Sequence, residues 1–402
     1  ERLVRRSVVS EIGRDLSSDQ VKVITGVRRC GKSVSAHMLL AGEKYAYVNF
    51  DDERLIDVTA ESLNLFYEVL NDISGGFEYL LLDEVQNVTG WELFVNRLHR
   101  NKVKIVITGS NAHLLSRDLA THLTGRHLVY EVYPFSFREF LEFKNVEYPA
   151  KGEWDTVTRG LLTSAFEEYF TLGGFPESYR LGNAAKYLQD LYGKIVVRDI
   201  AARHSVRNTK ALKELALYAA SNYSSKITPN KLKKIFELGS VNTVKNYLDY
   251  MEDAYLLSLV SSFSFKLKEG LRSPKKVYGI DIGMLRALTT SGQKNTGRLL
   301  ENVVFLELKR RGLNPEYYAD ERNRHEVDFV VKDANGKTTL IQVCAELSNL
   351  ETKEREMKAL RHAAGVFKKS RSVILTHGYS GVEDANGLQV ECVPVWEWLL
   401  DE

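Results

Sequence analysis

The first third of the chain alternates short apolar runs with segments of helical period. The apolar runs predict strands at residues 21–24, 45–50, 79–82, 104–108 and 127–132. Helical segments are expected between them, at 34–40 and 63–71. Strands that alternate with helices in this order predict a parallel sheet with helices on both faces. The expected fold class of this part is therefore α/β.

The loop after the first predicted strand has a recognisable pattern. It reads Gly26-Val-Arg-Arg-Cys-Gly31-Lys32-Ser33, which fits G-x-x-x-x-G-K-[ST]. Such a loop turns backbone N–H groups toward a phosphate, and the next helix adds its positive end. Lys32 is expected to reach the β- and γ-phosphates of ATP, and Ser33 to bind Mg²⁺. A glycine-rich turn before a surface helix is the alternative. The residues expected to contact the nucleotide are Gly26, Val27, Arg28, Arg29, Cys30, Gly31, Lys32, Ser33 and Val34.

Two acids follow the third predicted strand, where the chain reads Tyr79-Leu-Leu-Leu82-Asp83-Glu84. In an open α/β sheet the carboxyl ends of the strands hold the ligand, so these acids should lie beside the phosphates. We expect Asp83 to hold Mg²⁺ through water and Glu84 to orient or activate the attacking water. The alternative is a helix cap with a surface charge.

Two later positions have candidate roles in the same site. The strand at 104–108 runs into Gly109-Ser110-Asn111, and Asn111 or Ser110 is expected to contact the γ-phosphate or the attacking water. As plain turn residues they would look the same. Arg126, which precedes the strand at 127–132, would complete a neighbouring subunit's site if the chain forms a homo-oligomeric ring. A weak surface ion pair is the alternative.

The pattern becomes helical beyond residue 135. A helix is expected within 135–143, followed by helical period from 156 to 220. The sequence Gly173-Gly174-Phe-Pro176 interrupts this period and predicts a turn or hinge, so the segment is expected to form a helical lid over the nucleotide. Charged residues recur at helical spacing between Arg198 and Arg207. They form either a solvated face or a connection that passes the nucleotide state to later domains.

Residues 226–281 have the layout of a winged helix. Helices are expected at 230–237 and 241–254, and strands of a wing at 256–268 and 276–281. The second helix has an apolar stripe that includes Val244 and Met251, which leaves Lys245, Asn246 and Asp249 pointing outward. This helix predicts contact with DNA, although its acids would repel phosphate and many winged helices bind proteins instead.

The last hundred residues form another α/β segment. A helix at 297–311 carries Glu301 within an apolar stripe, where a carboxylate needs a metal or a basic partner. A strand at 326–331 places Asp328 on one face, and the strand at 339–344 places Gln342 and Cys344 on one face.

Composition agrees with a globular protein of two to four domains. The chain has 402 residues, of which 44% are hydrophobic and 27% charged, with a formal net charge of +2. No apolar run is long enough for a membrane span and no secretory leader is visible, so a cytoplasmic protein without a membrane partner is expected. Cys30, Cys344 and Cys392 lack the spacing of a disulfide framework or a zinc site. Contact with nucleic acid would require local basic patches. The candidate patches contain Arg2, Arg5 and Arg6, then Arg28 and Arg29, and Lys231, Lys233 and Lys234.

Several motifs together resemble one family. GVRRCGKS, LLLDEVQN, ITGSNAHLLS, LTGR and YPFSFREFL occur in the order and spacing of prokaryotic AAA+ ATPases that carry a C-terminal domain of unknown function. The later GGFPE, VVRDI and VDF-then-IQVC segments resemble the same family, so the likeness covers nearly the whole chain. It implies an ATPase core at 1–145, a helical lid at 146–220, a winged helix at 221–290 and a PD-(D/E)xK nuclease-like domain at 291–402.

The resemblance also implies that Glu301, Asp328 and Gln342 correspond to a nuclease site. In such a site the last two positions would be an acid and a lysine, whereas this chain has Gln342 and Cys344. Loss of the acid weakens Mg²⁺ binding, and loss of the lysine removes the group that activates water. We therefore expect a degenerate nuclease fold. The expected function is Mg²⁺-dependent ATP hydrolysis that drives the C-terminal modules on DNA. The alternatives are a nucleotide-gated switch with protein partners and an active metal-dependent nuclease.

Overall fold

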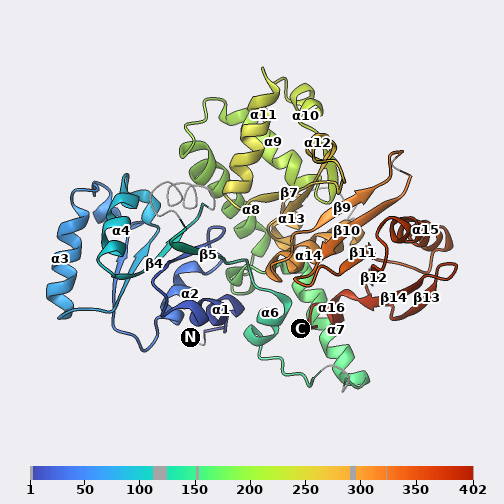
Figure 1. The fold of residues 1–402 in the computed structure, drawn as a ribbon, viewed down its shortest axis with the longest axis horizontal. Helices are drawn as coiled ribbons and strands as arrows, with labels where there is room; N and C mark the ends of the chain where they lie inside the picture. The colour runs from blue at the N-terminus through green and yellow to red at the C-terminus, as the bar shows by residue number, and fades with distance from the viewer. Residues whose placement is uncertain (1–2, 112–124, 151–153, 290–295, 323, 402) are drawn as a thin grey trace. The chain divides into compact units, whose positions relative to one another are not determined.

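The protein is described from a computed structural model, drawn as a ribbon in Figure 1. The structure describes residues 3–111, 125–150, 154–289, 296–322 and 324–401. It contains two compact units: residues up to 134 together with 253–255, and the rest of the chain. Arg2 of the predicted basic patch, and residues 123 and 124 of the LTGR segment, lie outside the described residues. The division into four domains stays a prediction.

The first unit is a parallel α/β sheet, as the sequence predicted. Its strands are β1 (Val21–Thr25), β2 (Tyr45–Asn49), β3 (Tyr79–Asp83), β4 (Lys104–Gly109) and β5 (His127–Glu131). Its helices are α1 (Ser7–Asp15), α2 (Lys32–Leu39), α3 (Leu63–Ser74) and α4 (Trp91–Arg100), with 3₁₀ turns η1 (Glu53–Leu55) and η2 (Val85–Asn87). Helices α1 and α4 were not predicted.

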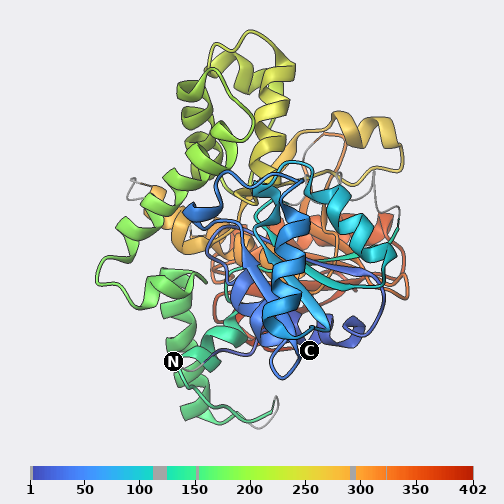
Figure 2. The same ribbon diagram turned by 90° about the vertical axis from the view of Figure 1, so that its left-hand side faces the viewer.

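The order of the strands, β2-β3-β4-β1-β5, decides which residues meet. All neighbouring pairs are parallel, with Val23 opposite Ile107 and Leu82 also opposite Ile107 on the other side of β4. Helices α3 and α4 pack together on one face of the sheet, and α3 lies in front of it in Figure 2. Helices α1 and α2 pack together and against β1, β4 and β5. The carboxyl ends of β3, β4 and β1 therefore lie side by side at one edge, where an open α/β sheet holds its ligand.

The second unit begins with helices. Helix α6 (Phe137–Phe143) starts at a capping box made by Ser136 and Glu139. The helical stretch that follows contains α7 (Thr156–Leu172), η3 (Pro176–Tyr179), α8 (Ala184–Lys194), a π-helix η4 (Ile195–Ala202) and α9 (Thr209–Ser221). The predicted charged face is only partly solvated, because Asp199 is buried while Arg198 and Arg207 are exposed. None of the described helices combines the length and apolar character needed to cross a membrane.

A winged helix follows, with one difference from the prediction. Strands β6 (Ser225–Ile227), β8 (Lys275–Gly279) and β7 (Leu257–Val260) form a three-stranded antiparallel sheet beside helices α10 (Pro229–Ile235) and α11 (Val241–Asp253). The expectation that a strand runs from 256 to 268 is wrong. Beyond Val260 the chain leaves β8, the Phe263 amide donates to the Tyr317 carbonyl at 2.7 Å, and helix α12 (Leu267–Arg272) begins.

The C-terminal part of the second unit is a six-stranded mixed sheet in the order β13-β14-β12-β11-β10-β9. Its strands are β9 (Glu316–Ala319), β10 (Glu326–Lys332), β11 (Thr338–Cys344), β12 (Arg371–Thr376), β13 (Gly381–Asp384) and β14 (Gln389–Pro394). The accompanying helices are α14 (Thr296–Arg310), α15 (Leu350–Val366) and α16 (Val395–Trp398), whereas α13 (Ile282–Leu288) packs against α7, α8 and α9. Both α14 and α15 contact β11, which places Glu301 of α14 near the strands that carry Asp328 and Gln342.

The predicted hinge at Gly173-Gly174 is an anchored turn. Gly173 has φ +78°, and a Cβ there would lie 2.3 Å from Asp281 Oδ1, so only glycine fits. The Gly174 amide donates to Asp281 Oδ2 at 2.6 Å, and the Met284 amide donates to Oδ1 at 2.8 Å. Burial of the carboxyl outweighs these donors and raises the pKa of Asp281 to about 6.

This raised pKa predicts how the stability of the second unit depends on pH. Between the ordinary pKa of 3.8 and about 6, the folded state binds more protons at Asp281 than the unfolded state. The contribution of Asp281 to stability is therefore full below about pH 4 and is lost as the pH rises through 6, by about 3 kcal/mol in total. Urea unfolding of the wild type and of Asp281→Asn between pH 4 and 7 measures the difference. Parallel pH profiles for the two proteins would contradict the prediction.

Candidate functional site

The loop between β1 and α2 has the backbone that its glycines make possible. Gly26 has φ +151°, and a Cβ there would lie 2.2 Å from the Val132 carbonyl oxygen. Gly31 has φ +99° and is the N-cap of α2. A side chain at Gly26 would collide with the backbone just after β5, so only glycine allows the loop to take this path. The other loop residues divide into Val27 and Cys30, which are fully buried, Arg28, which is half-buried, and Arg29 and Val34, which are exposed.

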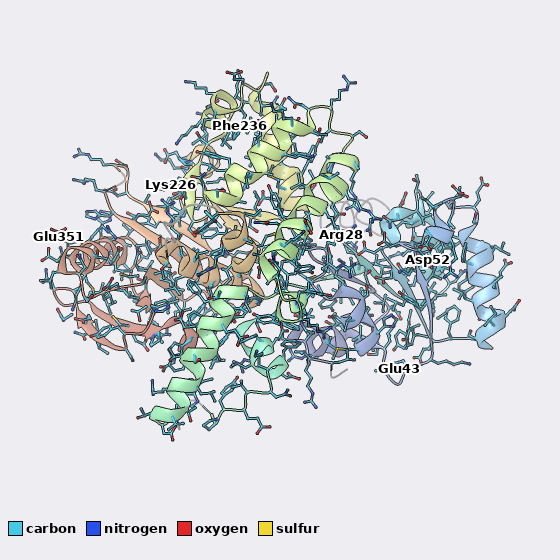
Figure 3. The ribbon with its side chains drawn as sticks, turned by 180° about the vertical axis from the view of Figure 1, so that it is seen from behind. Arg28, Glu43, Asp52, Lys226, Phe236 and Glu351 are labelled. Atoms are coloured by element: carbon cyan, nitrogen blue, oxygen red, sulfur yellow. The ribbon has the colours of Figure 1, made fainter. Side chains whose placement is uncertain are left out.

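A buried arginine holds this loop, which corrects one prediction. The sequence placed Arg6 in a surface basic patch, but its side chain is buried. Its Nη1 donates to the Cys30 carbonyl at 2.9 Å, and its Nη2 donates to the Tyr133 carbonyl. Arg6 therefore ties the loop to the chain after β5. At the loop surface, Arg28, which is labelled in Figure 3, has its Nη1 3.9 Å from Asp51 Oδ2.

Lys32 and Glu84 form an ion pair inside the site. Lys32 is 5% exposed, and its Nζ lies 3.3 Å from Glu84 Oε1 and 3.3 Å from the Val27 carbonyl. Burial alone would raise the pKa of Glu84, but the Lys32 ammonium and a 2.5 Å hydrogen bond from Gln86 Nε2 hold it below its ordinary value. Burial likewise opposes the charge on Lys32, and Glu84 outweighs it, so the pKa of Lys32 is raised. Glu84 thus stays an anion beside a buried cation.

Ser33 and Asp83 lie in contact beside this pair. Ser33 Oγ donates to Asp83 Oδ1 at 3.0 Å, and Tyr47 OH donates to Asp83 Oδ2 at 3.2 Å. Thr108 Oγ1 also donates to Asp83 Oδ1, and it accepts from the Glu84 amide at 3.0 Å. Sequence reasoning missed Thr108 and Tyr47. The only signal for them was their place near the carboxyl ends of β4 and β2, on either side of β3.

The two polar residues after β4 are both buried. Asn111 is 0% exposed and Ser110 is 2% exposed, so neither is an ordinary surface turn residue. Ser110 Oγ has no hydrogen-bond partner within the described part of the chain. Buried polar atoms usually find a partner, which makes Ser110 a second candidate for contact with a ligand at this edge. Whether Asn111 or Ser110 has the predicted role stays open.

Arg126 lies elsewhere in the first unit. Its side chain is exposed, and its carbonyl accepts from the amide of Val21, the first residue of β1. The loop follows Thr25 at the other end of that strand, roughly 13 Å away along the chain direction. The structure therefore does not bring Arg126 to the loop of its own chain. A role in a neighbouring subunit's site stays a prediction.

The second predicted cluster is also assembled, with additional members. Glu301, Asp328 and Gln342 line a cavity of about 370 Å³, and Glu326 and Glu356 line it as well. Gln342 Oε1 accepts from the Asp328 amide at 3.2 Å, and its Nε2 donates to Glu356 Oε2 at 2.6 Å. Burial and the neighbouring Asp328 raise the pKa of Glu301 to about 7.

The basic partner that Glu301 needs is Lys276, which was predicted only as part of a wing strand. Lys276 Nζ lies 3.0 Å from Glu301 Oε1, and Tyr278 OH donates to the same oxygen at 2.7 Å. Both residues come from β8. Their role was not predictable locally, because they lie 25 and 23 positions from Glu301 along the chain.

Three family models match successive parts of the chain. Residues 18–141 match the model of an AAA domain, residues 163–295 match the domain of unknown function DUF8612, and residues 296–398 match the domain of unknown function DUF4143. Among solved structures, the Walker-type ATPase PABY2304 of Pyrococcus abyssi is 14% identical, with a TM-score of 0.45 over 71% of this chain and 96% of that one.

Two relatives match along almost their whole length. The uncharacterized protein MJ1544 of Methanocaldococcus jannaschii is 37% identical, over 97% of this chain and 91% of its own. An uncharacterized protein of Haemophilus influenzae is 31% identical, over 98% of each chain. The chain therefore belongs to the family of these relatives, a P-loop AAA family in which an AAA domain is followed by C-terminal domains of unknown function.

Proposed function

We propose that the protein is an Mg²⁺-dependent ATPase whose hydrolysis cycle drives the winged helix and the C-terminal sheet, and that it acts on DNA. One observation carries the ATPase part of this proposal. Lys32 pairs with Glu84 and Ser33 with Asp83, so the first two residues of α2 contact the two acids at the carboxyl end of β3, beside the glycine loop.

The residues of this edge fit ATP and Mg²⁺. Ser33 and Asp83 offer a hydroxyl and a carboxylate 3.0 Å apart, which are the oxygen donors that Mg²⁺ prefers. The loop and the start of α2 supply backbone N–H groups for phosphates. Bound Mg²⁺ would neutralise charge on the phosphate oxygens. Lys32 would bind a phosphate with its buried ammonium, and Glu84 would accept the proton of the attacking water.

Lys32 would then control the availability of Glu84. Its ammonium pairs with Glu84 at 3.3 Å, and a triphosphate carries more negative charge than this single carboxylate. A phosphate that draws Lys32 away would free Glu84 to accept a proton. ATP binding and activation of the base would in this way be linked through one side chain.

In this proposal, a short segment of the chain would couple the nucleotide site with the winged helix. Residues 253–255, at the end of α11, belong to the first unit. There Tyr255 OH lies 3.1 Å from Thr25 Oγ1 and 3.4 Å from Glu131 Oε1. Thr25 is the residue immediately before Gly26. A movement of the loop would therefore reach the C-terminal end of α11 through one buried tyrosine.

DNA is the partner that the exposed face of α11 fits best. Lys245 and Asn246 are exposed there, as expected for a helix that reads a groove. Lys231 and Lys234 of the neighbouring helix α10 are exposed as well and would contact phosphates. The exposed Asp249 on the same face favours the second candidate function, a nucleotide-gated switch in which α11 binds a protein partner and the chain forms a homo-oligomer.

ATP turnover with and without DNA tests the proposal. We expect duplex, single-stranded or branched DNA to raise turnover roughly fivefold or more, which is within the usual range of coupling between two sites. Tyr255→Phe removes the hydroxyl contacts to Thr25 and Glu131 and should leave basal turnover unchanged while it reduces the stimulation. Turnover that ignores every form of DNA, together with an oligomeric state that follows the nucleotide, would support the switch instead.

A further inference from the structure

A lysine lies in the middle of the carboxylate cluster of the second unit. Lys276 Nζ is 3.0 Å from Glu301 Oε1, 2.8 Å from Glu326 Oε1 and 2.9 Å from Asp328 Oδ1. The lysine is 3% exposed. The three carboxylates come from α14 and β10, whereas the lysine comes from β8 of the winged-helix sheet, so one ammonium joins three elements.

These distances are those of ammonium hydrogen bonds. Charge-assisted N–H···O bonds are about 2.7–2.9 Å long. An ammonium has three N–H donors, and three carboxylate oxygens surround it, so each donor has an acceptor. A divalent ion would lie among the same oxygens, at about 2.1 Å for Mg²⁺ or about 2.3–2.6 Å for Ca²⁺. The ammonium and such an ion would compete for one position.

The second oxygens of Glu326 and Asp328 also have partners. Glu326 Oε2 lies 2.6 Å from Lys226 Nζ, at the edge of the same winged-helix sheet (Figure 3). Asp328 Oδ2 accepts from the Val343 amide at 2.9 Å. Three carboxylates and two ammonium groups leave at most one net negative charge, which is little for a divalent ion. Among the residues that the structure describes, no group of three or more His, Cys, Asp or Glu side chains is arranged to hold a metal ion.

The resemblance to PD-(D/E)xK nucleases implies a divalent metal at this place, and the residues present do not fit one. Gln342 stands where that site has an acid, and both ends of its amide are already bonded, to the Asp328 amide and to Glu356. A neutral amide in this position contributes no charge to a metal ion. The cluster therefore differs from a metal site in two ways: it has too little negative charge, and the Lys276 ammonium occupies the position that a metal ion would take.

We propose that Lys276 is the resident cation of this cluster: its ammonium takes the place of a divalent metal, closes the site to metals, and fastens the winged-helix sheet to the C-terminal sheet. A buried carboxylate cluster without its cation would be strongly destabilising, because like charges would face each other away from water. Removal of the ammonium should therefore both loosen the fold and create a divalent-cation site that the wild type lacks.

The test uses the full chain, freed of metal and nucleotide, with Mn²⁺ as the probe. Uptake of Mn²⁺ is followed by electron paramagnetic resonance and the thermal midpoint by near-UV circular dichroism. Mn²⁺ that binds elsewhere on the chain contributes equally to all variants, so only the differences in uptake between variants are interpreted. The main variant is Lys276→Met, which keeps most of the buried aliphatic stem and removes the charge. The matched control is Lys226→Met, since Lys226 contacts the outer oxygen of Glu326 at the edge of the cluster.

We expect Lys276→Met to melt at a lower temperature than wild type and to gain one Mn²⁺. Millimolar Mn²⁺ should then raise its midpoint by about 5 °C, since binding to the folded state alone stabilises it. Addition of Asp328→Asn to Lys276→Met should abolish the gain, and Lys226→Met should show none. In the wild type, Lys276 keeps Mn²⁺ out of the cluster. Asp328→Asn alone should therefore take up as much Mn²⁺ as the wild type does.

Three results would overturn the proposal. One is that the wild-type protein binds an Mn²⁺ ion that the Asp328→Asn variant does not bind. Another is cleavage of DNA by the wild type with Mn²⁺ that Lys276→Met abolishes, which would make Lys276 part of a working nuclease. The third is a well-folded Lys276→Met protein that gains no Mn²⁺. If Lys276→Met does not fold, Glu301→Gln decides: the proposal expects this variant to fold with unchanged Mn²⁺ uptake, whereas a metal ligand would lower it.

Discussion

Replacing Lys32 by alanine is expected to raise the dissociation constant for ATP by about 100-fold or more and to reduce ATP turnover to background. The ammonium is buried beside the loop, where a charge contact is little screened by water. The loop amides would still meet the phosphates, but the buried ammonium that pairs with Glu84 beside the loop would be gone. Binding of a fluorescent ATP analogue, displaced by ATP, measures the loss.

Two controls separate this effect from a folding defect. Lys32→Met keeps the buried stem and should bind ATP as poorly as Lys32→Ala. Lys44→Ala removes an exposed lysine of the same unit, whose Nζ donates to the Gly75 carbonyl, and should bind ATP like the wild type. ATP binding by Lys32→Met at wild-type affinity would mean that the loop recognises phosphate without this ammonium, and the proposed exchange with Glu84 would be wrong.

The first unit was predictable from sequence because its central strands β1, β3 and β4 are buried on both faces. A strand of this kind is a continuous apolar run, and the run Tyr79-Leu-Leu-Leu82 corresponds closely to β3. Helix α1 was missed because only Val8 and Ile12 are buried in it, too few for a clear period. The order of the strands follows from packing between distant segments, which no local pattern contains.

In the site, too, the residues in short motifs were predictable, and those brought in from distant segments were not. The loop at 26–33 and the acids Asp83 and Glu84 follow from short patterns, so their meeting at one sheet edge was expected. Thr108, Tyr47 and Arg6 each contribute a few contacts across the fold, and nothing in their sequence neighbourhood marks them. Arg6 looked like surface charge because it stands beside Arg5, yet the two have opposite environments.

The second unit was less predictable for a related reason. The alternation Ser262-Phe-Ser-Phe265 has the period of a strand, but the chain bonds there to Tyr317, more than fifty residues away. Lys276 is the strongest case. The sequence indicated that Glu301 needs a metal or a basic partner, and only the structure decides between them, because the partner comes from the winged helix.

Glu84→Gln is expected to reduce ATP turnover by about 100- to 1000-fold while ATP stays bound, because the amide cannot accept the proton of the attacking water. Its shape is nearly unchanged, and the bond from Gln86 Nε2 needs only an oxygen acceptor. Lys32 also loses the carboxylate 3.3 Å from its ammonium, so its attraction to phosphate should not weaken. Rapid gel filtration after incubation with labelled ATP should recover mostly uncleaved ATP on the variant.

The matched control is Glu43→Gln, which changes an exposed glutamate of the same unit and should turn over ATP like the wild type (Figure 3). A rate for Glu84→Gln within about twofold of wild type would exclude Glu84 as the base and leave the ion pair with Lys32 as a structural contact. A variant that neither binds nor hydrolyses ATP would instead mean that Glu84 holds Lys32 in place for the nucleotide. Only the proposed role predicts that Glu84→Gln still binds ATP and no longer hydrolyses it. Such a result means that the carboxylate acts in a step after the nucleotide is bound.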